Sequence, residues 1–555
     1  MSVSSWTAGA AAQTVTAQTT AQTTARTPVK STDTKAAAEA EARKLLCRSK
    51  SQPGLGPAPS LTLSGDETQY LPQFGSESAD CTQFEFTFDG HLTVESVSAF
   101  EVDRDGNEYA EGTTFRPRAR LGSRYSSGLG MLPLHLELVY EHDLYTGIVG
   151  GNSNPLDDSL SREKELFPGH RAGDQELRKA FARLSFGRAL HLSAGWMTSY
   201  WGLGLVANDG AHGWQPGSAR FADPISGDRV LRALIATGPH TDLGLVAAVG
   251  GDLVDPDLLS GDDVLLPGDK AKQVVAALSL GEGKAHGIGV YGALRKQEAA
   301  SGDQTHVKAM DVYGRTKHQL RGAWFNFQAE AAYITGTTEL APSTAFPEHD
   351  VSQFGLAVRA ELDAGQFGSV VDVLYASGDS DLDDAKQSAF RADPNYEMGL
   401  LLYRHVLAAQ SARGVVTAAD TNLVGVPAED RERIATRGSA TNTVAIFPRL
   451  RVRPTDGFEV YGGALFAFAS SLPADPFNSR VIGGGSARNA LGAMSTHVLG
   501  TEYDVGLRFR VNVNGMEGTL GAEGGVFTPG DAFSKSDGQH LPTVGALRLL
   551  LDTRI

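Results

Sequence analysis

The most constraining feature of the sequence is a pair of strictly alternating segments within residues 113–145, joined by a turn rich in serine and glycine. In the first segment, apolar residues such as Phe115 and Leu121 fall at odd positions. Four arginines fall at even positions: Arg116, Arg118, Arg120 and Arg124. Because alternate residues of a β-strand face opposite sides, this segment is predicted to form a strand with one apolar and one basic face.

The second segment alternates in the same way but carries acidic groups. Its apolar face holds Leu134, Leu136 and Leu138, and the other face holds His135, Glu137, Glu141 and Asp143. With a turn centred on residues 127–128, Arg120 is predicted to lie near Glu137 and Arg116 near Glu141. Both segments are longer than the ~5–6 residues that are usual for a strand of a soluble sheet.

Strand length and facing pattern together favour a transmembrane barrel over a soluble all-β protein. A strand of ~9–11 residues, tilted by about 45°, crosses a bilayer. Only a closed barrel satisfies all backbone polar groups of such strands, with the apolar face toward lipid and the charged face toward the lumen. The sequence has no apolar run of about 18 residues, so no transmembrane helix is predicted.

Alternation bounded by turn residues predicts about eighteen strands. They fall near residues 82–96, 113–126, 131–145, 177–187, 189–201, 228–238, 241–254, 271–281, 285–298, 305–317, 319–335, 351–364, 366–378, 441–453, 456–470, 496–513, 515–527 and 543–555. Connections after even-numbered strands are short, whereas most of those after odd-numbered strands are long, and residues 299–304 are the exception. This segregation is typical of an outer-membrane barrel with both termini on the periplasmic side.

We therefore predict an all-β fold, a transmembrane antiparallel up-and-down β-barrel over residues 81–555, in the outer membrane of a Gram-negative bacterium. Residues 1–80 are predicted to be a separate, mostly disordered periplasmic segment, because residues 11–30 are a Thr/Ala/Gln repeat. Within it, residues 32–50 are predicted to form a short helix. Residues 7–13 look like the cleavage end of a signal peptide, so we expect the precursor to begin earlier.

The chain has only two cysteines, Cys47 and Cys81, at or beyond the edges of the N-terminal segment. In an oxidising periplasm they can form one disulfide that holds the predicted helix near the barrel mouth. Two unpaired thiols are the alternative.

Basic residues recur on predicted lumen faces beyond the first ladder. They are Arg449, Arg451 and Arg453 on one strand and Arg508 and Arg510 on another, and Glu502 and Asp504 are acidic neighbours on the latter strand. One interpretation is a basic path for an anion, because guanidinium groups bind carboxylate and phosphate. The other is that cross-strand ion pairs fill the lumen and rigidify the wall.

The long connection 379–440 contains a helical pattern over residues 395–410, with Met398, Leu401, Leu402, His405 and Val406 on one face. This helix is predicted either to fold into the pore or to cap it. Acidic clusters such as residues 379–384 have oxygen ligands suited to Ca²⁺ but lack the full twelve-residue loop pattern. Solvated loop charge is the alternative, and no other cofactor is predicted.

Catalytic motifs are scarce: GxSxG, HExxH and CxxC do not occur in the sequence. His91, His135 and His191 face the predicted lumen, which leaves an outer-membrane lipid hydrolase as a minor alternative. The formal net charge of −16 argues against a nucleic-acid partner.

Three short motifs carry a resemblance: residues 376–384 (ASGDSDLDD), 500–507 (GTEYDVGL) and 525–533 (GVFTPGDAF). They are similar to the alginate-export-type family of Gram-negative outer-membrane barrels. The resemblance implies an eighteen-stranded barrel over residues 82–555 that exports an anionic polysaccharide through an arginine-lined pore, with Glu502 and Asp504 facing inward. Residues 195–210 also look like a segment of related barrels. The chain departs from the family in ending on Ile555 instead of an aromatic residue.

The expected function is that of a monomeric porin or exporter, giving passive passage to small or polymeric anions. Its expected surroundings are outer-membrane lipid and lipopolysaccharide, with a periplasmic partner for residues 1–80. The first alternative is a non-conducting assembly barrel that anchors an envelope complex, and the second is the lipid hydrolase. An open lumen, a partner for the N-terminal segment, and a rim Ser–His pair are the features that distinguish them.

Overall fold

The computed structural model describes residues 82–555 apart from 111, 129–133, 147–148, 151–173, 212–218, 224–226, 263, 283, 341–342, 344, 429 and 514–515. The N-terminal segment 1–80, its predicted helix and both cysteines lie outside these residues. Among the described helices, none is both long and apolar enough to cross a bilayer.

Eighteen long antiparallel strands form one closed barrel. They are β1 (Gln83–Val97), β4 (Gly112–Gly128), β5 (Leu134–Thr146), β7 (Asp174–Phe186), β8 (Leu190–Thr198), β9 (Arg229–His240), β10 (Leu245–Val254), β11 (Lys270–Leu280), β12 (His286–Glu298), β13 (Gln304–Leu320), β14 (Ala323–Thr338), β15 (His349–Ala364), β16 (Phe367–Ala376), β18 (Thr443–Thr455), β19 (Phe458–Phe468), β20 (Val498–Val513), β21 (Met516–Pro529) and β22 (Val544–Arg554). The predicted all-β barrel is confirmed.

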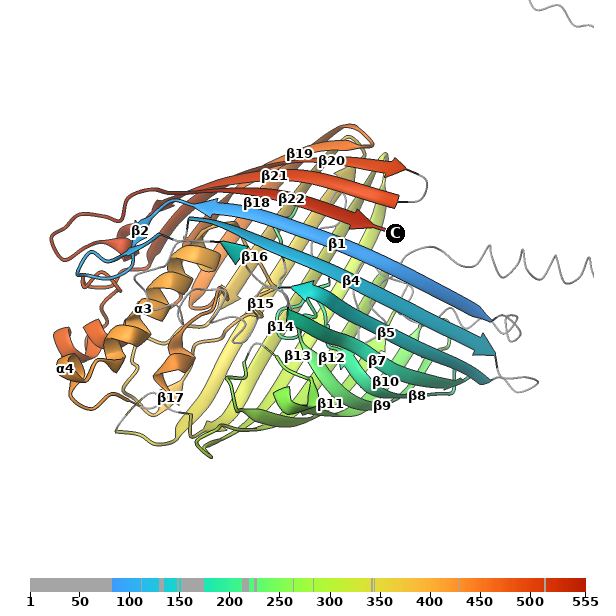
Figure 1. Ribbon diagram of the computed structural model, residues 1–555, viewed down its shortest axis with the longest axis horizontal. Helices are drawn as coiled ribbons and strands as arrows, with labels where there is room; N and C mark the ends of the chain where they lie inside the picture. Colours follow the sequence, from blue (N-terminus) through green and yellow to red (C-terminus); the bar gives the residue numbers. More distant parts are fainter. Residues whose placement is uncertain are drawn as a thin grey trace, which may run out of the picture. The chain divides into compact units, whose positions relative to one another are not determined.

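The barrel closes where its first and last strands meet. β1 pairs with β22 on one side, Leu92 opposite Leu551, and with β4 on the other. Figure 1 shows β1 lying between β22 and β4. Closure leaves no free sheet edge, which is the condition for strands to sit in hydrocarbon.

Alternation of the strands separates an apolar outer surface from a polar interior. On β22, the outward Leu547, Leu549 and Leu551 are exposed, while the inward Arg548 between them is fully buried. Exposed apolar side chains recur on the outer faces of most strands, for example Val249 and Val505. This outer band of apolar residues, around charged inner faces, defines a transmembrane β-barrel of the outer-membrane type.

Short turns join the strands at one rim, and long connections join them at the other. The short-turn rim also holds the start of β1 and the end of β22, so on the usual pattern it faces the periplasm. The connection 299–303 between β12 and β13 is short although it lies at the long-loop rim, as the sequence indicated. At that rim, β2 (Phe100–Glu101) and β3 (Glu108–Tyr109) form a small hairpin.

The long connections do not all stay outside. The connection 377–442 carries β17 (Lys386–Gln387), η3 (Leu402–Leu407), α3 (Ala408–Ala419), α4 (Thr421–Val424) and η4 (Arg431–Ile434). The connection 199–228 carries Trp201, Leu203 and Leu205, which are buried in one apolar cluster with Leu400–Leu402 and inward residues of the wall. The remaining short elements are β6 (Val149–Gly150), η2 (Pro256–Leu258), η5 (Asn478–Ile482) and η6 (Asp531–Phe533).

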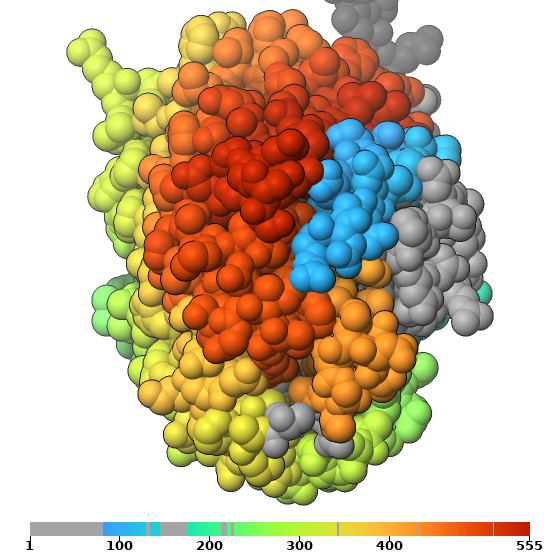
Figure 2. Space-filling view, turned by 90° about the vertical axis from the view of Figure 1, so that its left-hand side faces the viewer, coloured from blue at the N-terminus to red at the C-terminus, as the bar shows by residue number. Residues whose placement is uncertain are grey.

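The helix predicted at residues 395–410 is confirmed only in part, because its predicted bounds are wrong. The helical backbone begins at Leu402, and continues from η3 into α3 as far as Ala419. Met398, Leu401 and Val406 are almost fully buried. Of the two predicted positions, pore interior or external cap, the structure has the segment folded inward. Seen from the long-loop end, segments of the connections meet over the barrel mouth (Figure 2).

Candidate solute path in the barrel lumen

The β4 ladder consists of Arg116, Arg118, Arg120 and Arg124, and it faces the lumen as predicted. Each guanidinium meets a carboxylate: Arg116 Nη1 lies 2.8 Å from Glu95 Oε2 and Arg118 Nη2 lies 3.2 Å from Asp89 Oδ1. Arg120 Nε lies 2.6 Å from Asp143 Oδ1 and Arg124 Nε lies 2.5 Å from Glu137 Oε1.

The predicted pairing of β4 with β5 is confirmed, but its predicted register is wrong. Arg120 lies opposite Asp143, not near Glu137, and Arg116 contacts Glu95 of β1, not Glu141. The reason is the turn: β4 continues to Gly128 and β5 begins at Leu134, so the connection lies beyond residues 127–128. Glu141 instead contacts Arg178 at 3.0 Å and Lys179 at 3.1 Å on β7.

The second set of predicted basic residues also faces inward. Arg449 pairs with Asp372, and Arg451 Nη2 lies 3.0 Å from Asp363 Oδ1. Arg508 Nη2 lies 2.9 Å from Glu523 Oε1, and Arg510 Nε lies 3.2 Å from Glu517 Oε1. Arg453 Nη2 lies 3.6 Å from Glu459 Oε2.

Exposure of these side chains increases toward the short-turn rim. Arg449 and Arg508 have side chains only 3% and 2% exposed, whereas those of Arg453 and Arg510, farther along the same strands, are 25% and 29% exposed. On β4, exposure likewise rises from Arg116 to Arg124. The lumen is therefore open to water at the periplasmic rim and filled further in.

Glu502 holds the inward segment of the 377–442 connection. Its carboxylate accepts hydrogen bonds from the backbone N–H groups of Leu400 (2.5 Å), Leu401 (2.9 Å) and Leu402 (2.8 Å). Leu402 is the first residue of η3, and Leu400 and Leu401 directly precede it, so the carboxylate lies at the start of this helical segment, where a negative charge is favourable. Asp504 is buried on the same face of β20, two residues away.

A second wall carboxylate, which the sequence analysis missed, holds the 199–228 connection. Glu330 of β14 accepts hydrogen bonds from the backbone N–H groups of Leu203 and Leu205, the latter at 3.2 Å. Next to it, Asp311 accepts a hydrogen bond of 3.0 Å from Trp201 Nε1. Both inward connections are thus bound to the barrel wall by carboxylates.

Removing the Glu502 carboxylate should loosen the segment that it holds. Hydrogen bonds to a charged group contribute about 1.5–3 kcal/mol each, so Glu502→Ala should accelerate hydrogen exchange at Leu400–Leu402 by roughly tenfold or more. Glu517→Ala, which removes a half-exposed carboxylate of the neighbouring strand, is the control and should leave exchange there unchanged. Equal protection in the Glu502 variant would exclude the anchoring role.

Asp223 brings the two inward connections together in mid-lumen. Its carboxylate lies 2.5 Å from Arg116 Nη2 of β4, 2.8 Å from His91 Nε2 of β1 and 3.4 Å from Arg404 Nη2 of the 377–442 connection. Arg548 Nη1 lies 4.0 Å away. Asp223 lies in a connection without alternation, so no periodic signal in the sequence pointed to it.

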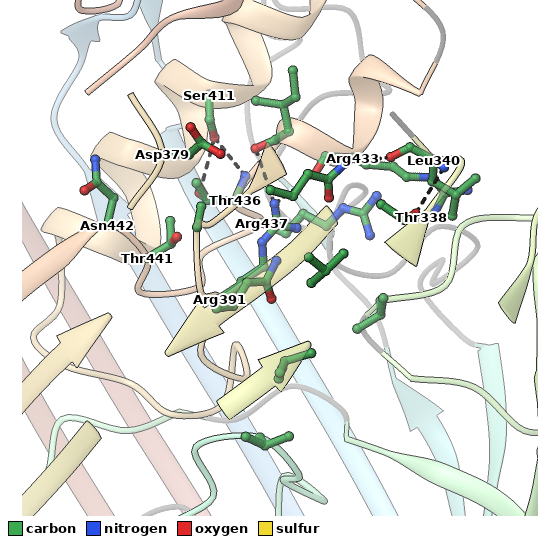
Figure 3. Close-up of a pocket in the computed structure, with 18 of the residues that line it drawn as sticks. Thr338, Leu340, Asp379, Arg391, Ser411, Arg433, Thr436, Arg437, Thr441 and Asn442 are labelled. Carbon is green, nitrogen blue, oxygen red and sulfur yellow. Dashed lines mark hydrogen bonds between the residues drawn. The ribbon is translucent and has the colours of Figure 1, made fainter. Parts of the chain in front are cut away.

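A cavity of about 530 Å³ lies at the long-loop side, between the 377–442 connection and the wall. Figure 3 shows Arg391, Arg433 and Arg437 lying together along it. Arg433 binds Asp269 through both terminal nitrogens, at 2.9 and 3.2 Å. Apolar side chains such as Val230, Val307 and Ile334 form much of the remaining lining. The cavity is therefore lined by both charged and apolar side chains.

Asp475 lines this cavity and lies outside the strands, and burial raises the pKa of its carboxyl from 3.8 to about 7. Between these two pH values, the folded protein holds a proton on Asp475 that the unfolded chain has lost. The contribution of this proton to the free energy of unfolding is therefore complete below pH ~4 and lost as pH rises through ~7. Asp475→Asn, which is neutral throughout, should remove that part of the pH dependence of the melting temperature. Parallel curves for both proteins would contradict the shifted pKa.

Within the described residues, no three His, Cys, Asp or Glu side chains gather in a metal-binding arrangement. In the acidic cluster 379–384 that was considered for Ca²⁺, Asp383 Oδ1 lies 2.6 Å from Arg480 Nε. His191 Nδ1 lies 2.9 Å from Ser185 Oγ, but both are buried, and His191 Nε2 contacts the carbonyl of Gly238. A catalytic triad would require a carboxylate at that nitrogen.

No protein-family model matches the chain, and no curated protein matches it. The structure is similar to solved outer-membrane proteins at low identity. Acinetobacter baumannii OccAB1 has a TM-score of 0.47 and 9% identity, covering 86% of this chain and 98% of its own. Pseudomonas aeruginosa OccK2 (OpdF), solved in complex with glucuronate, has 0.45 and 8%, covering 85% and 96%. The outer membrane protein OpdK of Pseudomonas aeruginosa has 0.43 and 11%, covering 85% and 98%. These are likenesses of fold.

Proposed function

We propose that this protein is an outer-membrane porin through which small anionic solutes pass without an energy source. The observation that carries this proposal is the β4 ladder, which runs from the mid-lumen at Arg116 to the water-exposed end of the lumen at Arg124. Such a row of guanidinium groups offers successive binding positions for an anion, each weakened by a neighbouring carboxylate so that the solute is released. In this proposal, the path continues from the mid-lumen to the cavity at the long-loop side.

The solute fluxes of a matched pair of molecules test the proposal. Lactate and lactamide have nearly the same size, but only lactate is charged, and their entry into proteoliposomes can be followed by swelling. Changing Arg118, Arg120 and Arg124 together to Gln should lower lactate flux several-fold and leave lactamide flux unchanged, since only the ionic term is removed.

The control variant changes three exposed basic residues near the short-turn rim, Arg188, Lys284 and Arg321, to Gln. It alters the net charge by the same amount outside the path and should leave both fluxes unchanged. Equal loss of lactate flux in the two variants would show that overall charge, not the ladder, attracts the anion.

A second form of the proposal differs in its cargo. The resemblance to alginate-export-type barrels implies that a polymeric uronate moves outward along the same arginines. Fragments of that polymer would then inhibit lactate flux.

The filled interior supports a different candidate, a non-conducting barrel that anchors an envelope complex. For this alternative, neither lactate nor lactamide should enter proteoliposomes that contain the wild-type protein.

We also propose that the barrel works as a monomer in lipid and lipopolysaccharide. Residues 1–80 would form a periplasmic segment, separate from the barrel at 81–555 and available to a periplasmic partner. Pull-down from periplasmic extract with and without residues 1–80 tests that division.

A further inference from the structure

The mid-lumen cluster is unusual in that three arginines share one carboxylate although each has its own. Arg116 is bound to Glu95, Arg404 to Glu397, and Arg548 to Glu523 at 2.5 Å. Asp223 is the additional, shared acid, and its carboxylate is almost completely buried. Withdrawing it would leave each of these three guanidinium groups with a counter-charge, so the arginines would not become unpaired buried ions.

Asp223 differs from the two wall acids of this cluster, Glu95 and Glu523, in how its backbone is held. Glu95 and Glu523 belong to strands, but the backbone around Asp223 is held by guanidinium donors. The carbonyl of Arg220 accepts a hydrogen bond of 2.6 Å from Arg508, and that of Phe221 accepts one of 2.8 Å from Arg548. The ring of Phe221 packs against Phe447 and Tyr461 of the wall, which keeps the segment close when the aspartate side chain turns away.

We propose that Asp223 is an internal ligand: its side chain occupies a carboxylate-binding site that a passing solute takes over by displacing it. The donors that would receive the solute are Arg116 Nη2, His91 Nε2 and Arg404 Nη2, which now contact Asp223. They come from two wall strands and one inward connection. A solute carboxylate then takes over the contacts of the aspartate at these donors. The displaced Asp223 carboxylate keeps its own charge and must turn toward other donors or water, so this movement sets the cost of the exchange.

This inference rests on the proposed passage of anions, and it names the site and ligand class on that path. It also explains why the lumen is narrow at this level without solute. The displaced carboxylate returns when the solute leaves, so the same contact that selects for a carboxylate narrows the path again behind it.

Acetate has the size and charge of the missing side chain, and it is the probe for a rescue experiment. In Asp223→Ala, the vacated site should bind acetate at least tenfold more tightly than in the wild type, where acetate must compete with Asp223. The rise in melting temperature with acetate concentration measures this binding. Acetamide, of the same shape but uncharged, should have no such effect.

Two further variants keep the experiment decisive. Asp223→Asn preserves the size of the side chain and serves if the alanine variant fails to fold. Acetate flux through this variant should be higher than through the wild type, because no internal carboxylate competes for the site. Asp223→Ala combined with Arg116→Gln removes the main donor and should abolish the acetate effect. The proposal is overturned if acetate stabilises the alanine variant no better than the wild type, or equally well without Arg116.

The melting experiment requires no conduction, so its outcome is separate from that of the flux measurement. If the barrel conducts lactate but acetate does not stabilise the alanine variant, the porin function would be supported and the role of Asp223 as an internal ligand excluded. If acetate binds once Asp223 is removed but the barrel never conducts, the binding site would be supported and the porin function excluded.

Discussion

Excising residues 393–439 is expected to raise the single-channel conductance several-fold. This segment contains Met398 and Leu400–Leu402, which fill the lumen, and Arg404, which contacts Asp223. Ion flow through a pore is limited by its narrowest filled section, so emptying that section should open a wide water-filled path. Inward carboxylates such as Glu502 would then face water instead of a helix start.

The structure indicates where to close the deletion. The N–H of Ala392 donates to the carbonyl of Ala440 at 3.0 Å, and Arg391 and Thr441 form an antiparallel bridge. A two-residue Asn-Gly turn therefore joins Ala392 to Ala440 without moving the wall. Deleting only α4, which lies at the outer surface with Leu423 exposed, is the control and should leave conductance unchanged. A folded deletion variant with wild-type conductance would show that this segment does not obstruct the path.

Placing an arginine on the lipid face is expected to cost most at the middle of a strand. Val505 lies near the centre of β20 with its side chain 59% exposed on the outer surface, and Val513 lies on the same face at the short-turn end, 50% exposed. Val505→Arg should lower the free energy of unfolding by ~2–4 kcal/mol, and Val513→Arg by only ~0–1 kcal/mol, because the cost of a charge falls toward the interface.

Reversible folding into phospholipid vesicles, followed against denaturant concentration, measures both values. Both valines lie on the same face of the same strand, so the difference between the two losses in free energy of unfolding reports the effect of depth in the bilayer. Equal destabilisation by both substitutions would contradict a membrane-spanning position for β20.

The strands could be predicted from the sequence because alternation is a local property. Leu547, Leu549 and Leu551 face outward and Arg548 inward for the same reason that any strand alternates, so facing was correct on β4, β18, β20 and β22. Register depends on where a turn falls, and a shift of a few residues moved Arg120 from the predicted Glu137 to Asp143.

The inward connections could not be predicted in the same way, because their anchors are set by long-range contacts. One signal was present nevertheless. Inward carboxylates opposite an arginine pair with it, as Asp372 does with Arg359 and Glu523 with Arg548. Glu330 lies opposite Tyr313 and Ala357, and Glu502 opposite Leu465 and Phe527.

A carboxylate without a cationic cross-strand neighbour must find donors elsewhere, since a buried charge without hydrogen bonds is costly. In both of these strands, the donors are backbone N–H groups of an inward connection. An inward acidic residue whose cross-strand neighbours are apolar therefore indicates a loop bound inside a barrel. This signal can be used only when the strand register is known.

The most direct test of the account is the reversal potential of the purified wild-type barrel in a planar bilayer under a KCl gradient. Discrete conducting steps, with a reversal potential displaced toward that of chloride, are the predicted result, because the β4 ladder and the mid-lumen arginines favour anions. A reversal potential displaced toward that of potassium, or a bilayer that stays silent both for the wild type and for the 393–439 deletion, would contradict it.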